Sequence, residues 1–253
     1  MTGLVLLHGF TGSGASFDEL LPQLAKLGWA GPLLRPSLLG HGAAPAPRVL
    51  RFEQEVDRLA AEIRRAGFSG AHLCGYSLGA RLGLGLLGRH ASLFRSATLV
   101  GVHPGLSDAA ERAARVGSDE RWCELLSRQG MAGFLRAWEA QPLFETQRAL
   151  AAPQRERQRQ IRQSHSADGL MQALRVLGLG QMPDYRGVLP AVALPVRLLV
   201  GSRDSKFEKL AQDCVAACGR IDLVRVEGAG HNLPLEAPVQ LARVLTQTLE
   251  DRV

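Results

Sequence analysis

Three residues with side chains suited to nucleophilic chemistry occur in the order serine, acid, histidine. Ser77 stands in the segment GYSLG, Asp204 in GSRDSKF and His231 in GAGHNLP, and each comes directly after an apolar run. The carboxyl ends of parallel strands meet at one edge of a sheet, so residues placed this way would lie together. A histidine that an acid orients activates a serine hydroxyl. We therefore predict a catalytic triad of Ser77, Asp204 and His231.

The small residues around Ser77 indicate a tight turn from a strand into a helix. Only small residues on both sides let the helix return past the strand, and the turn then holds the hydroxyl above the sheet edge. The segment HGF at residues 8–10 follows the first apolar run. We expect the backbone N–H groups of Phe10 and Leu78 to form an oxyanion pocket, and His8 to brace the loop.

Simpler roles exist for two of the three residues. Asp204 would also serve as the N-cap of the helix that follows it, and His231 as a surface turn residue. These alternatives do not account for three such residues in this order after three apolar runs, so the triad is favoured.

Apolar runs alternate with amphipathic stretches along most of the chain. We expect strands at residues 4–7, 33–35, 71–75, 97–102, 196–201 and 221–226, and helices at residues 17–27, 52–66, 77–88, 206–217 and 237–249. Strands that are apolar throughout and separated by helices are typical of a mostly parallel sheet with helices on both faces. The sequence predicts an α/β fold.

The alternation stops between residues 107 and 185, which contain no strand candidate and are rich in Arg and Gln. We interpret this region as a helical lid inserted into a core made of residues 1–106 and 186–253. A charged stretch such as residues 153–163 is either a solvated face or a source of cations that point inward.

Composition limits the class of protein. The chain has 253 residues, 46% of them hydrophobic, and no apolar run reaches the roughly 18 residues of a membrane span. Without a leader-like start, we expect a cytoplasmic protein with no membrane insertion. The net charge is +6 and arginine far outnumbers lysine. The dispersed positions of the arginines argue against nucleic acid as a partner. Their excess indicates either ordinary solvated surface residues or a small anionic substrate, since guanidinium groups pair with carboxylates.

The four cysteines are Cys74, Cys123, Cys214 and Cys218, and no two of them have CxxC spacing. They are best interpreted as inert thiols. We expect no metal site.

A dispersed set of further motifs resembles one family. The triad pattern resembles the α/β-hydrolase fold, and the rest narrows the match to 2-succinyl-6-hydroxy-2,4-cyclohexadiene-1-carboxylate synthase of menaquinone biosynthesis. The matching positions are HPGL at 103–106, Glu111, Arg112, Arg115, Ser118, Asp119, Trp122, Trp138, QPLF at 141–144, LRVLG at 174–178, Arg81 and DSKF at 204–207.

The resemblance implies a lyase that needs no cofactor. It would eliminate pyruvate from 2-succinyl-5-enolpyruvyl-6-hydroxy-3-cyclohexene-1-carboxylate, a polycarboxylate, and the triad would serve in proton abstraction. By the same resemblance, five residues would bind the substrate: Tyr76, Arg81, Arg115, Trp138 and Arg162.

The chain departs from the family pattern at a few positions. Ser37 and Leu39 replace Asp and Pro, Ala43-Ala44 replaces a small residue and serine, and Pro234 replaces a histidine. Glu139 replaces an aromatic residue, which would put a negative charge near a pocket meant for an anion.

Two other functions remain open. An esterase or carbon–carbon bond hydrolase would share the triad without needing the three arginines. A non-catalytic binding protein on the same fold would tolerate loss of the triad. Fold alone does not decide among them.

Overall fold

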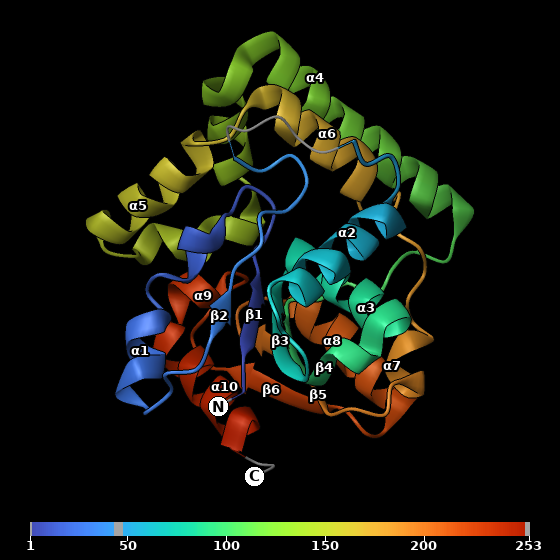
Figure 1. Cartoon of the computed structure of the whole chain (residues 1–253). Coiled ribbons are helices and arrows are strands. Elements are labelled where there is room, and N and C mark those ends of the chain that lie inside the picture. The colour runs from blue at the N-terminus through green and yellow to red at the C-terminus, as the bar shows by residue number, and fades with distance from the viewer. Residues whose placement is uncertain (1, 43–47, 251–253) are drawn as a thin grey trace.

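The structure, a computed structural model, describes residues 2–42 and 48–250; residues 43–47, with Ala43 and Ala44, lie outside the described residues. Within the described ranges, six strands form one parallel sheet in the order β2-β1-β3-β4-β5-β6 (Figure 1). They are β1 (Leu4–Leu7), β2 (Leu33–Leu34), β3 (Ala71–Tyr76), β4 (Phe94–Val100), β5 (Val196–Gly201) and β6 (Asp222–Val226). The parallel sheet predicted from the apolar runs is confirmed.

Helices cover both faces of the sheet because its central strands are buried on both sides. Along β1, Val5 and Leu7 pack in one apolar cluster, and Leu4 and Leu6 pack in the other. The helices on the first face are α2 (Phe52–Arg65), α3 (Leu78–His90), α7 (Val188–Ala191) and α8 (Ser205–Cys218). Those on the second face are α1 (Leu21–Lys26) and α10 (Pro238–Glu250), and a short α9 (Leu233–Glu236) precedes α10.

The expected helix at residues 17–27 is wrong in its first part. A 3-10 helix (Gly14–Phe17) comes first, and α1 begins only at Leu21. Pro22 stands in its first turn, where the missing N–H has no partner to lose. Another 3-10 helix (Ala91–Leu93) follows α3, and β4 begins at Phe94, three residues before its expected start, where the exposed Arg95 interrupts the apolar run.

The described chain between β4 and β5 contains helices and no strand. These are α4 (Ala109–Glu139), a 3-10 helix (Pro142–Ala149), α5 (Ala152–Gln163), α6 (Ala167–Leu177) and then α7. Gly130, with φ +61° and ψ −170°, kinks α4. In Figure 1, α4, α5 and α6 lie together above the strands, at one end of the sheet. Of these helices, α4 and α6 share an apolar cluster of their own, which includes Phe134, Leu126 and Leu170.

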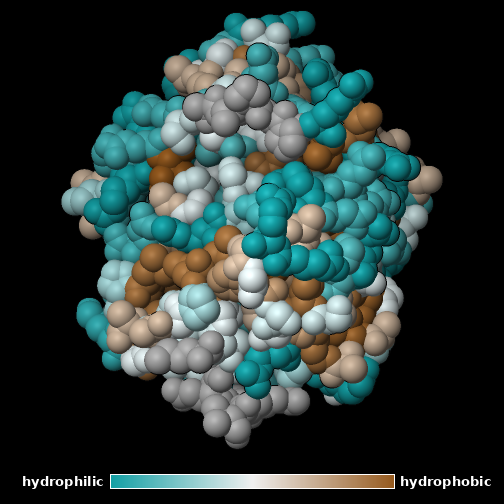
Figure 2. All heavy atoms as spheres, viewed as in Figure 1, coloured by the Kyte–Doolittle hydropathy of each residue, from teal (hydrophilic) through white to brown (hydrophobic). Residues whose placement is uncertain are grey.

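Few large hydrophobic side chains are exposed among the described residues. They are Leu27, Leu50, Val116 and Val239, from separate segments. In Figure 2, hydrophilic side chains cover most of the upper part of the view. Of the helices in residues 2–42 and 48–250, none has the length and apolar character to cross a membrane.

Candidate active site

Ser77 occupies a strained turn between β3 and α3. Its φ of +52° and ψ of −107° lie outside the helical region, so α3 begins at Leu78 rather than at Ser77. A Cβ on Gly75 would lie 2.5 Å from the carbonyl oxygen of Gly79, and one on Gly79 would lie 2.1 Å from that of Leu7. The flanking glycines are therefore required by close backbone packing, as the sequence pattern indicated.

The three predicted triad residues lie in hydrogen-bonding contact. Ser77 Oγ is 3.1 Å from His231 Nε2, and His231 Nδ1 is 2.6 Å from Asp204 Oδ2. The imidazole and carboxylate are both buried. With the Nδ1 proton directed at the carboxylate, Nε2 is left to accept the serine proton.

Asp204 fills both of the roles considered for it. Its Oδ1 accepts the backbone N–H of Phe207 at 3.4 Å and so caps α8, while Oδ2 faces His231. A carboxylate that is fixed by a helix terminus holds the imidazole in one orientation.

The predicted oxyanion donors belong to the same cavity as Ser77. Phe10 and Leu78 both line this cavity, which has a volume of about 540 Å³. The Gly12 N–H donates to the Gly9 carbonyl at 3.0 Å, so residues 9–12 form a tight turn. Leu78 stands at the N-terminus of α3, where backbone N–H groups favour negative charge.

Aromatic side chains form one part of the cavity wall. Trp138 and Phe144 come from the chain between β4 and β5, hereafter the helical segment, and Tyr76 comes from β3. Trp138 packs edge-on against Phe10, with the ring centres 5.2 Å apart. Trp138 and Tyr76 thus line the cavity, as expected from the resemblance.

Two half-buried arginines, Arg81 and Arg115, and one carboxylate form a cationic corner of the cavity. Arg81 donates to the Leu177 carbonyl at 2.7 Å, and Arg115 donates to Asp119 at 2.9 Å. Burial, and secondly the Arg115 charge, lower the pKa of Arg81 to about 9, against the opposing effect of Asp119. Two guanidinium groups share one carboxylate, so this corner favours an anion.

His103 and Lys206 also line the cavity. Both were noted in the sequence only as positions that match the family and were not assigned to the substrate site. Burial, and secondly the Arg81 charge, lower the pKa of His103 to about 4. Its Nδ1 accepts the Gly105 N–H at 3.1 Å, so the neutral ring carries its proton on Nε2. His103 follows β4 closely, so the rule that located Asp204 also points to it.

Arg162 lies in α5 and is almost fully buried at the cavity wall. It donates to Glu139 at 2.9 Å and to Gln147 Oε1 at 3.2 Å, and its guanidinium carbon lies 5.1 Å from the centre of the Phe144 ring. Glu139 lines a second cavity instead of the one that contains Ser77. The negative charge of Glu139 therefore lies on the side of Arg162 that faces the second cavity.

The other departures from the family pattern have local explanations. Ser37 donates through its hydroxyl to the His41 carbonyl at 3.0 Å, and the Leu39 N–H donates to Glu55 at 2.8 Å. Pro234 stands in the first turn of α9, a favourable position for proline. In the described part of the chain, no three His, Cys, Asp or Glu side chains are grouped so as to hold a metal ion.

Comparisons with known proteins agree with this geometry. The model of the alpha/beta hydrolase family matches residues 4–244. The 2-succinyl-6-hydroxy-2,4-cyclohexadiene-1-carboxylate synthase of Salmonella paratyphi C (strain RKS4594) is 33% identical over 246 residues, which are 97% of this chain and 93% of that protein.

Solved structures show the same fold. MenH from S. aureus has a TM-score of 0.90 at 24% identity, covering 99% of this chain and 94% of that one. A carboxylesterase of the thaumarchaeon Nitrososphaera gargenis has a TM-score of 0.82 at 19% identity, covering 98% and 89%. The resemblance expected from the sequence is confirmed: the chain belongs to the α/β-hydrolase family and, within it, to the family of 2-succinyl-6-hydroxy-2,4-cyclohexadiene-1-carboxylate synthases.

Proposed function

We propose that this chain is a carbon–oxygen lyase that forms 2-succinyl-6-hydroxy-2,4-cyclohexadiene-1-carboxylate by eliminating pyruvate from its enolpyruvyl precursor. A proton leaves the ring carbon, electrons move through the ring, and the bond to the enolpyruvyl oxygen breaks. Pyruvate leaves as its enolate, which takes up a proton to give pyruvate, so that one proton is removed and one is returned. Family membership supports this reaction, and the cations around the Ser77 cavity support its anionic substrate.

The triad supplies the base. The proton passes to the couple formed by Ser77 Oγ and His231 Nε2, which are 3.1 Å apart, and Asp204 stabilises the imidazolium that results. The N–H groups of Phe10 and Leu78 stabilise the charge that develops on the succinyl carbonyl oxygen.

One observation carries the proposal, namely the placement of three arginines on the cavity that contains Ser77. Arg81, Arg115 and Arg162 all line it, from two parts of the chain. A guanidinium group binds a carboxylate through a planar pair of donors, and each charge-assisted bond contributes about 1.5–3 kcal/mol. A substrate with several carboxylates uses such groups, whereas a neutral ester does not.

We also propose that residues 107–185 act as a lid on the core. The cavity takes Trp138, Phe144, Arg162 and Leu174 from this segment, and takes Ser77 from the sheet edge. A substrate between the two layers would be shielded from water, which strengthens its contacts with the arginines.

Ester hydrolysis is the second candidate function, because the same triad geometry fits acyl transfer. The test compares pyruvate release from the enolpyruvyl cyclohexene with nitrophenol release from nitrophenyl esters. Faster turnover of the esters would contradict the lyase. Ser77→Ala should remove most activity, by up to about a millionfold in a triad enzyme. Ser205→Ala, at another serine of the cavity wall, should retain it.

A further inference from the structure

Three buried histidines lie in a row behind the loop that carries Phe10. His8 follows β1, His41 follows β2, and His165 lies between α5 and α6. The ring centres of His8 and His41 are 4.9 Å apart, and those of His41 and His165 are 5.3 Å apart, both in edge-to-face geometry. They thus connect two loops at the sheet edge to the helical segment.

Each of the three rings accepts a backbone N–H on one nitrogen. His8 Nε2 accepts from Leu38 at 3.3 Å and His41 Nε2 from Thr11 at 3.1 Å. His165 Nδ1 accepts from Gly42 at 2.8 Å. An imidazolium has no lone pair for such a bond, so all three contacts require the neutral ring.

The contact of His8 acts on the peptide that contains the proposed oxyanion donor. His8 Nδ1 donates to the Gly9 carbonyl at 2.9 Å, and that carbonyl shares its peptide unit with the Phe10 N–H. In a trans peptide the C=O and N–H bonds point in opposite directions. Holding the carbonyl therefore aims the N–H, and the hydrogen bond polarises it as a donor.

The contact of His41 acts on the next peptide, between Phe10 and Thr11. Thr11 has φ +61°, a left-handed conformation that is unfavourable for a β-branched residue. The bond from its N–H to His41 compensates for this strain and prevents the peptide from rotating. Phe10 also packs edge-on against the His41 ring, at 5.5 Å between centres.

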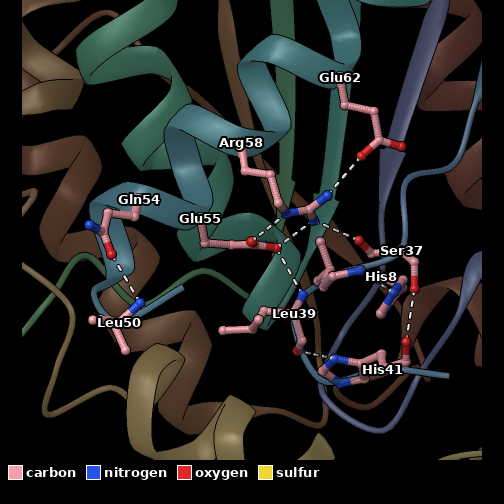
Figure 3. A network of polar contacts seen from close by, with 10 residues as sticks. His8, Ser37, Leu39, His41, Leu50, Gln54, Glu55, Arg58 and Glu62 are labelled. Carbon is pink, nitrogen blue, oxygen red and sulfur yellow. Dashed lines mark hydrogen bonds and ion pairs between the residues drawn. The ribbon is translucent and has the colours of Figure 1, made fainter. Parts of the chain in front are cut away.

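His41 is itself held by a polar network that reaches α2 (Figure 3). Its Nδ1 donates to the Leu39 carbonyl at 2.9 Å, and the Leu39 N–H donates to the fully buried Glu55. Arg58 donates to both Glu55 oxygens at 2.7 Å and to the Ser37 carbonyl at 2.8 Å. The imidazole is thereby fixed to the core of the fold.

We propose that His41 is a positioning residue that sets the orientation of the Phe10 oxyanion donor, and that His165 ties this setting to the helical segment. The inference rests on the proposed oxyanion role of Phe10. It does not depend on which substrate the site uses. Any reaction that develops negative charge on a substrate oxygen beside Ser77 uses this donor.

The surroundings keep His41 neutral. The groups that face it are His8 and His165, and beyond Leu39 and Ser37 lies the ion pair of Glu55 and Arg58. Burial, and then electrostatic repulsion from His8 and His165, hold the pKa of His41 well below its ordinary value. Above that pKa the bond to Thr11 persists, and protonation would remove it.

The test replaces His41 and measures two reactions of the full-length protein. His41→Leu keeps most of the volume and removes the acceptor, whereas His41→Gln places an amide oxygen near the position of Nε2. The reactions are pyruvate release and covalent labelling of Ser77 by a fluorophosphonate. We expect His41→Leu to lower kcat and the labelling rate about ten- to a hundredfold, with KM nearly unchanged. His41→Gln should restore most of both rates.

His72 provides a matched control, because it is also a fully buried histidine with two polar partners, Ser96 and Thr98 at 2.7 and 2.9 Å, and does not line the cavity. His72→Leu should lower the melting temperature and leave the labelling rate of folded protein unchanged. Labelling needs no lyase activity. A wild type that is labelled but releases no pyruvate would contradict the proposed function and leave this inference standing.

Wild-type labelling and kcat in folded His41→Leu would overturn the proposal. If that variant does not fold, His165→Leu decides in its place. It removes the link to the helical segment and should slow labelling about three- to tenfold, scaled down from the loss of a whole donor. An unchanged labelling rate in His165→Leu would then reject the inference.

Discussion

Arg162 donates a hydrogen bond to Glu139 at 2.9 Å across the wall between two cavities. Arg162 lines both the cavity of Ser77 and the second one, of about 440 Å³, whereas Glu139 lines only the second. The carboxylate both holds the guanidinium and offsets part of its charge.

Glu139→Gln should therefore strengthen binding of the anionic substrate. The amide keeps a hydrogen-bond acceptor and removes the opposing charge, so we expect KM to fall about two- to tenfold, an effect that added salt reduces. Steady-state kinetics at low and high salt measure this. Glu156→Gln is the control, because Glu156 lines the same second cavity and pairs only loosely with Arg159. A higher KM in Glu139→Gln would show that holding Arg162 outweighs the charge.

Arg115→Ala should lower kcat/KM for the anionic substrate about ten- to a hundredfold and leave hydrolysis of a neutral ester unchanged. Arg115→Lys should restore part of the loss, because an ammonium group lacks the planar fork. Arg175→Ala is the control. It removes an exposed ion pair with Glu120 in the same segment and should leave kcat/KM unchanged.

Asp119 complicates that variant, because Arg115→Ala leaves this largely buried carboxylate without its partner at 2.9 Å. Burial already raises the pKa of Asp119. The double variant Arg115→Ala/Asp119→Asn should recover thermal stability and stay defective in kcat/KM. Recovery of both would show that Arg115 only bridges the helix.

Gly101→Ala tests whether the small residue at position 101 is needed to keep the His231 ring in place. Gly101 has φ +56°, and a Cβ there would lie 2.7 Å from His231 Cε1. We expect the ring to shift away from Ser77 and kcat/KM to fall at least about tenfold, in line with the cost of a misplaced catalytic group. In Gly67→Ala, φ is +77° with nothing within 4 Å of the added atom. That control carries the same strain of about 1 kcal/mol and should keep full activity; equal activity in both variants would contradict the prediction.

Acid should destabilise the protein through its buried histidines. Burial lowers the pKa of His8 to about 4 and that of His72 to about 3, from an ordinary 6.5. Between these values the unfolded chain binds more protons than the folded one. The stability that the neutral histidines contribute is thus fully present above pH 6.5. It is lost as the pH falls toward 4 for His8 and toward 3 for His72.

Urea unfolding at a series of pH values measures this loss. His72→Gln should make the free energy of unfolding fall less steeply with falling pH. The slope should decrease by about one proton, or about 1.4 kcal/mol per pH unit, whatever the effect of the substitution on stability at pH 7. A slope identical to that of the wild type would mean that His72 does not contribute.

Local patterns were sufficient for the triad and for most of the sheet. The runs at residues 4–7 and 196–201 are strands with the predicted bounds, because continuous apolar runs of this length are stable only when buried in a parallel sheet. Ser77, Asp204 and His231 were identified from the turns after such runs. Parallel topology brings those turns to one edge, however far apart they are in sequence.

Long-range packing decided the rest. Thr11 and His41 are 30 residues apart, and Gly42 and His165 are 123 apart, and no periodicity links such positions. Whether Glu139 faced the substrate or the back of Arg162 depended on how α4 and α5 pack, which their amphipathic patterns leave undetermined. A sequence specifies which faces are buried, but the partner that each buried polar atom finds is a property of the assembled fold.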